Sequence, residues 1–185
     1  YSTKPVIIDN SYLGYKIEYY LDNFEFHYLR NIGRVNGLII GNYKFLEIKY
    51  KNSKQQKRFE DRRRTAYMGS RMHFFRELWK NNLDSAGFEL KDSLNNKINL
   101  RNTLFDSQQS NNSVVAKYLK FDGSLFLSYK PEKDFTIIKM SQDKIYFNNI
   151  GFFDPYAISW EGKMAEQRIG DILPFEYHLK AEARK

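Results

Sequence analysis

The sequence predicts an α+β fold in which one long or kinked helix over residues 57–85 packs across one or more antiparallel β-sheets. Two observations lead to this prediction. Over most of the chain, short segments such as Tyr15 to Tyr20 alternate apolar and polar side chains with the period of two that strands have. Between residues 57 and 85, the apolar side chains recur instead at the spacing of one helix face.

The first fifty residues predict an antiparallel meander. Residues 6–8 form a short apolar run, and alternation begins at Tyr15 and continues through Phe24, Phe26 and Tyr28. Gly33 and Asn36-Gly37 supply turn chemistry, because both Asn and Gly tolerate positive φ. Further strands are expected on the far side of this turn.

Two hairpins are predicted in the second half of the chain. Val114 to Phe121 and Ser124 to Tyr129 are alternating runs on either side of Asp122-Gly123, which is a strong turn signal. Phe135 to Met140 and Lys144 to Phe147 repeat the arrangement about a polar connection.

The predicted helix contains residues that cap or interrupt helices. Its apolar stripe consists of Phe74, Phe75, Leu78 and Trp79. Ser70 is a good N-cap and follows Gly69, so residues 57–85 form either one helix kinked at Gly69 or two helices. Gly87 is placed to end the helix in a left-handed conformation.

Length and composition indicate a single α+β domain over residues 1–185, or two lobes divided near the polar connection 91–113. The chain has no cysteine, which excludes disulfides and thiolate chemistry. No apolar run is long enough to span a membrane. The absence of a signal peptide and of an initiator Met suggests a piece excised from a longer protein.

The net charge of +8 suits an acidic partner, and it also suits a surface that is merely solubilising. The candidate binding residues are Arg62, Arg63, Arg64, Tyr67 and His73. Consecutive helical residues point about 100° apart, so the three arginines cannot serve one face. We therefore expect one of them to make a half-buried ion pair and the others to be solvated, which disfavours nucleic acid as the partner.

No motif identifies a reaction. The three histidines lack metal-ligand spacing, and nucleophile and phosphate-loop motifs are absent. His73 is of interest only because the first turn of a helix lowers a histidine pKa. We predict no catalytic residue, no metal and no cofactor.

Three segments carry a family resemblance. Their marks are Leu13-Gly14-Tyr15, then Tyr67, Gly69-Ser70, His73-Phe74 and Gly87-Phe88, then Arg168 and Leu173-Pro174. In this order they resemble the C-terminal region of carboxypeptidase-like regulatory-domain-containing proteins, a Gram-negative envelope family. The resemblance implies export to the periplasm or outer membrane and an upstream β-sandwich. It implies no peptidase activity, because the zinc-binding set of carboxypeptidases is missing here.

The expected function is therefore that of a non-catalytic envelope module that binds or supports a polysaccharide, a peptide or another envelope protein. Two alternatives stay open. A glycan or peptide hydrolase requires two carboxylates, or a histidine and a carboxylate, converging in one pocket. A binder of nucleic acid or anionic polysaccharide requires Lys49, Lys51, Lys54, Arg58 and Arg62 to gather on one exposed face.

Overall fold

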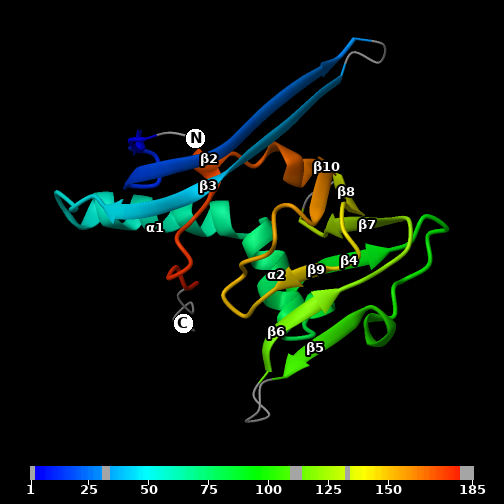
Figure 1. The fold of residues 1–185 in the computed structure, drawn as a ribbon. Helices are drawn as coiled ribbons and strands as arrows, with labels where there is room; N and C mark the ends of the chain where they lie inside the picture. Colours follow the sequence, from blue (N-terminus) through cyan, green and yellow to red (C-terminus); the bar gives the residue numbers. More distant parts are fainter. Residues whose placement is uncertain (1–2, 31–33, 109–113, 132–133, 180–185) are drawn as a thin grey trace. The chain divides into compact units, whose positions relative to one another are not determined.

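The computed structural model describes residues 3–30, 34–108, 114–131 and 134–179 (Figure 1). The chain divides into two compact units, residues 1–65 and 66–185. Residues 91–108 belong to the second unit, and residues 109–113 lie outside the described ranges, so a division into lobes near 91–113 stays a prediction.

Ten strands in three sheets and three α-helices make up the regular structure of the described residues, with three short 3-10 helices. The strands are β1 (Val6–Asn10), β2 (Tyr15–Leu29), β3 (Arg34–Glu47), β4 (Phe88–Lys91), β5 (Leu104–Gln108), β6 (Val114–Leu119), β7 (Ser124–Tyr129), β8 (Phe135–Met140), β9 (Ile145–Phe147) and β10 (Ile158–Gly162). The helices are α1 (Ser53–Tyr67), α2 (Arg71–Trp79), α3 (Leu83–Ala86), η1 (Leu100–Asn102), η2 (Lys163–Glu166) and η3 (Ile169–Asp171).

The predicted α+β fold with a long helix over 57–85 is wrong, because the chain is mostly β-sheet and its helices are short. The helical signal is divided among α1, α2 and α3, of 15, 9 and 4 residues. Gly69 has a positive φ of 77° and Ser70 is extended, so the chain leaves helical geometry between α1 and α2. Asn81, with φ 54°, breaks it again after α2.

The first unit contains the predicted meander, in which β1, β2 and β3 pair in sequence order and antiparallel. The predicted turn at Asn36-Gly37 is wrong, because both residues pair within β3. Gly33, the other residue with predicted turn chemistry, lies outside the described residues. Helix α1 packs its Phe59 ring against the end of this sheet at Gly14. A Cβ atom at Gly14 would lie 2.5 Å from that ring, and the φ of 75° also favours glycine, so this close approach requires glycine.

A β-bulge in β2 decides which side chains share a face. Leu21 pairs with Gly41 and Asn23 pairs with Ile40, so Asp22 is an extra residue without its own partner in the register. In a regular strand, side chains two residues apart share a face. The bulge therefore brings the even-numbered Phe24, Phe26 and Tyr28 to the same face as the odd-numbered Tyr15, Ile17 and Tyr19.

The second unit holds two antiparallel sheets, with strand orders β10-β8-β7-β4 and β5-β6-β9. Both predicted hairpins are wrong in their pairing, although strands occur in all four segments. β6 and β7 belong to different sheets, and so do β8 and β9. The Asp122-Gly123 turn thus carries the chain from one sheet to the other.

The core of the second unit forms around α2, whose Phe74, Phe75 and Leu78 are completely buried. Phe75 stacks on Phe153 with ring centroids 4.7 Å apart and also contacts Phe147 of β9. The predicted apolar stripe is therefore core rather than surface.

Candidate functional site

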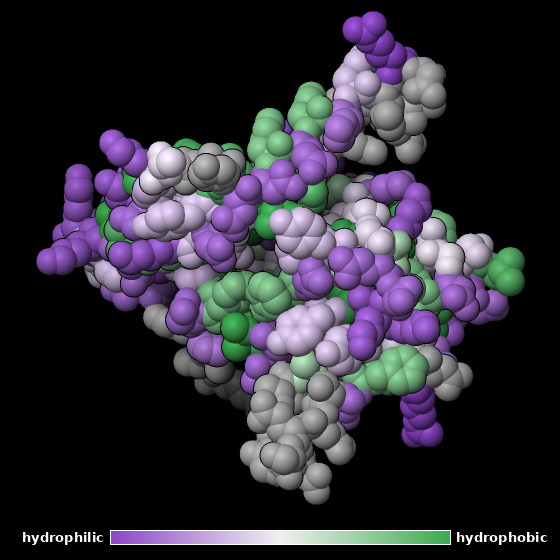
Figure 2. Space-filling view, viewed as in Figure 1, coloured by the Kyte–Doolittle hydropathy of each residue, from purple (hydrophilic) through white to green (hydrophobic). Residues whose placement is uncertain are grey.

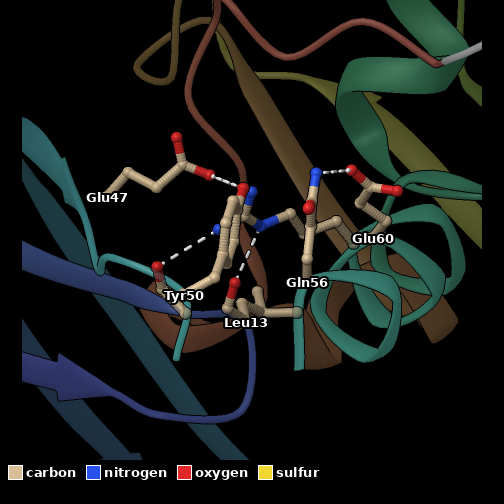
Figure 3. A network of polar contacts seen from close by, with 7 residues as sticks. Leu13, Glu47, Tyr50, Gln56 and Glu60 are labelled. Carbon is tan, nitrogen blue, oxygen red and sulfur yellow. Dashed lines mark hydrogen bonds and ion pairs between the residues drawn. The ribbon is translucent and has the colours of Figure 1, made fainter. Parts of the chain in front are cut away.

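Arg63 is a structural anchor of the first unit. It lies four residues after Phe59 on α1, and its side chain is only 6% exposed. Its Nε donates to the Leu13 carbonyl at 2.8 Å and its Nη2 donates to the Gly14 carbonyl at 3.1 Å. Its Nη1 pairs with Glu47, which also accepts from the Tyr50 hydroxyl (Figure 3). These contacts occupy the guanidinium, so Arg63 is not available to bind a partner.

The neighbouring arginines are less buried than Arg63. Arg62 donates to the Tyr12 carbonyl at 3.2 Å and stacks over the Tyr12 ring at 4.1 Å. Arg64 is half-buried. Arg63 makes the ion pair that the sequence predicts for one of the three arginines. The expectation that the other two are solvated is wrong, because Arg62 and Arg64 are both half-buried.

Helix α1 carries a basic column on its outer side. Lys54, Arg58 and Arg62 are spaced by four residues, and Lys57 lies beside them. Lys54, Lys57 and Arg58 are exposed. Of the five cations that the anionic-partner alternative requires on one exposed face, Lys54 and Arg58 are thus exposed on one face of α1, whereas Arg62 on that face is half-buried.

Tyr67 and His73 lie together in the second unit, and both are buried. Their ring centroids are 4.8 Å apart, and Phe88 lies 4.9 Å from His73 on another side. His73 Nδ1 accepts from the Gly69 N–H at 3.1 Å. Burial lowers the pKa of His73 to about 4, so the imidazole is neutral at physiological pH and serves packing.

Sequence reasoning missed Arg71 and Arg76, which join α2 to later segments. Arg76 donates to three backbone carbonyls, those of Ile150, Phe175 and Tyr177, at 3.0, 2.8 and 2.7 Å. Arg71 donates to the Met164 carbonyl, and burial lowers its pKa to about 10. The available signal was spacing: Arg71 stands three and four residues before Phe74 and Phe75, on the apolar face of α2.

The strongest candidate for a binding surface is one that the sequence did not single out. We define the hairpin patch as Phe24, Phe26, Tyr28 and Ile39 on β2 and β3. Their side chains are 57%, 62%, 59% and 53% exposed, whereas Tyr15, Ile17 and Tyr19 on the same face are buried. Figure 2 shows apolar side chains at the surface along this hairpin. This face is thus apolar along its whole length, but only its outer half is open to solvent.

The hairpin patch contains no charged side chain. In the strand register, Phe24 pairs with Ile39, Phe26 pairs with Gly37, and Tyr28 pairs with Val35. Because Gly37 has no side chain, the Phe26 ring has only backbone opposite it. Such a surface can bury apolar area but cannot neutralise charge or coordinate a metal.

Other kinds of site are not indicated within the described ranges. There, no group of three or more His, Asp or Glu side chains could hold a metal ion. None of the helices in that part of the chain has the length and apolarity to span a membrane. Comparison with protein-family models, with curated proteins and with solved structures gave no match.

Proposed function

We propose that this chain is a non-catalytic module that binds a protein partner through the hairpin patch. The observation that carries the proposal is the bulge at Asp22, which keeps Phe24, Phe26 and Tyr28 on the apolar face where that face is uncovered. In a strand with one solvated face, apolar side chains normally point inward and alternate with polar side chains that point to the solvent. Here the pattern is maintained beyond the buried half, which suits a face that a partner covers.

The chemistry of the patch favours a protein over a polymer of sugars or nucleotides. A polysaccharide requires hydrogen-bonding groups, and the patch offers one, the Tyr28 hydroxyl. Nucleic acid requires cations for its phosphates, and the patch has none. Exposed Phe and Tyr without charge are instead typical of the cores of protein interfaces.

The size of the patch is sufficient for a docking site. A fully buried aromatic side chain hides about 150–250 Å². Three rings that are more than half exposed, together with Ile39, therefore present on the order of 400 Å². This lies in the range of about 300–600 Å² in which the largest patch of a monomer is often functional.

A second candidate function rests on the basic column of α1. Like charges at Lys54, Arg58 and Arg62 destabilise an isolated helix. In addition, the first turn of α1 has no acidic residue that would interact favourably with the helix dipole. An arrangement that opposes helix stability is reasonable where it binds an anionic polymer. This candidate predicts heparin binding that weakens with salt and is lost in the variant Lys54→Glu/Arg58→Glu. Heparin binding that changes neither with salt nor in this variant would rule out this candidate function.

The hydrolase alternative has no support from the contacts of His73. Glu77, one turn further on α2, directs its carboxylate to Lys80 and Asn82.

Export to the periplasm or outer membrane stays a prediction from the family resemblance, and fractionation of cells that express the full-length gene would test it.

The hairpin patch is tested by site-specific crosslinking followed by affinity measurement. A photoreactive phenylalanine at position 26 should crosslink one partner in native cells, and the same group at Leu94, which is 79% exposed, should not. With that partner purified, Phe24→Ser/Phe26→Ser should weaken binding about 30-fold or more, since a buried aromatic anchor contributes about 2 kcal/mol. Leu94→Ser is the matched control.

The folding of these variants can be checked independently. Substitutions at exposed positions usually change the unfolding free energy by no more than about 0.5 kcal/mol. Equal affinity of the double variant and the wild-type chain for the crosslinked partner would contradict the proposal. So would crosslinking of the same partner from position 94.

A further inference from the structure

One edge of β2 is open along the hairpin patch. β1 pairs with β2 only between Tyr15 and Tyr19, although β2 continues to Leu29. Among the described residues, the outer edge of β2 beyond Tyr19 therefore has no paired strand. A long edge of this kind is a ready template for another strand.

The direction of the backbone groups follows from the register. The Ile48 N–H donates to the Gly14 carbonyl at 3.0 Å, so this pair is hydrogen-bonded across β2 and β3. Hydrogen-bonded and non-hydrogen-bonded pairs alternate in an antiparallel ladder. The next pair, Tyr15 with Glu47, is then non-hydrogen-bonded, and Tyr15 turns its backbone toward β1, where it pairs with Asn10.

The same alternation, followed along β3, applies beyond the bulge. Every odd-numbered residue of β3 turns its backbone away from β2, and Ile39 and Gly37 are two of these. Their partners Phe24 and Phe26, and Tyr28 after them, consequently turn their own N–H and C=O groups to the outer edge of β2. Each of these three residues thus presents an exposed ring and an open pair of backbone groups.

We propose that the partner adds a β-strand to this edge, antiparallel to β2 and in line with β1, opposite Phe24, Phe26 and Tyr28. This inference rests on the proposed function and specifies how the partner binds. β1 already occupies the first half of the edge in this orientation, with Val6 opposite Tyr19. The added strand continues an existing pairing instead of creating a new kind of contact.

The chemistry of the partner strand follows from the geometry. Residues directly opposite each other in a ladder have their side chains on the same face. The residues that bond to Phe24, Phe26 and Tyr28 therefore also lay their side chains beside the three rings. We expect an extended segment with uncharged apolar side chains at alternate positions, and no proline at those positions because proline lacks the N–H.

The test uses a fluorescent peptide of alternating valine and threonine, Lys-Lys-Val-Thr-Val-Thr-Val-Thr-Val-Lys-Lys, titrated with the whole chain. Binding is followed by anisotropy. N-methylation of three valines, whose N–H groups face β2, should weaken binding at least about tenfold. N-methylation of the three threonines, which face away, is the matched control and should change binding by less than about threefold.

Three results would overturn the strand addition. If the unmodified peptide does not bind, or if both methylated peptides bind alike, the edge is not used. If light scattering shows a dimer that Phe24→Ser/Phe26→Ser converts to a monomer, the occupant is a second copy. In the first two cases the proposed function still stands or falls on the crosslinking at position 26, so the two failures are distinguishable.

Discussion

Replacing Arg63 by methionine tests whether one guanidinium holds the first unit together. Methionine retains much of the apolar stem of the side chain but not the guanidinium, which lies 4.0 Å from the centre of the Tyr15 ring. It removes the donors to Leu13, Gly14 and Glu47. The Leu13 and Gly14 carbonyls then lose the charged donor that Arg63 supplies to each of them.

The expected loss can be worked out contact by contact. A hydrogen bond to a charged group contributes about 1.5–3 kcal/mol, so the two carbonyl bonds together account for about 3–6 kcal/mol. The ion pair adds less, because the Glu47 side chain is 52% exposed and the pair is screened by water. We expect Arg63→Met to cost about 4 kcal/mol and Glu47→Gln about 1 kcal/mol. Arg63→Lys should resemble methionine more than arginine, because one ammonium cannot donate to all three groups.

The assay must report on the first unit alone. Both tryptophans, Trp79 and Trp160, lie in the second unit, so their fluorescence during urea unfolding monitors that unit as an internal control. Amide exchange measured by mass spectrometry over residues 13–21 monitors the first unit. A loss of about 4 kcal/mol shortens protection there by about a thousandfold.

Two outcomes would contradict this role of the Arg63 guanidinium. If Glu47→Gln reduces protection as much as Arg63→Met does, the ion pair and not the carbonyl bonds anchors the unit. A cost below about 1 kcal/mol for Arg63→Met would mean that the carbonyls find other donors. Arg62→Met, at the half-buried neighbouring position, is the control and should cost under about 1 kcal/mol.

Two further predictions concern His73 and the bulge. The pKa of His73 is about 4 in the folded chain, below the value of about 6.5 in an unfolded one, so the unfolded state binds the proton first. The unfolding free energy of the wild-type chain should therefore fall by about 3 kcal/mol between about pH 6.5 and 4, as measured by tryptophan fluorescence in urea. This loss should be absent in His73→Gln. It should be present in the control His178→Gln, since His178 is exposed. Deletion of Asp22 should restore regular alternation with Leu21 and Phe24 still on one face, so binding of the crosslinked partner should persist. If the deletion abolishes binding while exchange shows β2 and β3 still paired, the bend of the bulge itself is needed.

The local character of each segment was accessible from the sequence. A short apolar run indicated a strand where β1 lies, and alternation predicted strands where β2, β7 and β8 lie. Ser70 was identified as an N-cap, and its hydroxyl accepts from the His73 N–H at 3.1 Å. The α+β assignment failed because helical spacing over 57–85 shows which residues face inward and not whether the helix is continuous. Gly69 and Asn81, both at positive φ, decide that.

The site was less predictable than the fold. Arg62, Arg63 and Arg64 attracted attention as a charge run, but burial of one guanidinium against two carbonyls depends on Gly14, which is 49 residues distant in the chain. Phe24, Phe26 and Tyr28 were read as continuing the alternation of Tyr15. Their change from odd to even numbering was the visible trace of the bulge.

By itself, the sequence determined where most of the strands form, which stripe of α2 is apolar, and that the chain is basic, because these depend on neighbouring residues and on composition. Only the tertiary structure decided which strands pair, as the separate sheets of β6 and β7 show. Pairing is set by contacts between residues far apart in the chain, and a turn such as Asp122-Gly123 can serve either a hairpin or a passage between sheets. The same holds for exposure: the sequence of β2 is apolar along its whole face, and the fold alone leaves half of it uncovered.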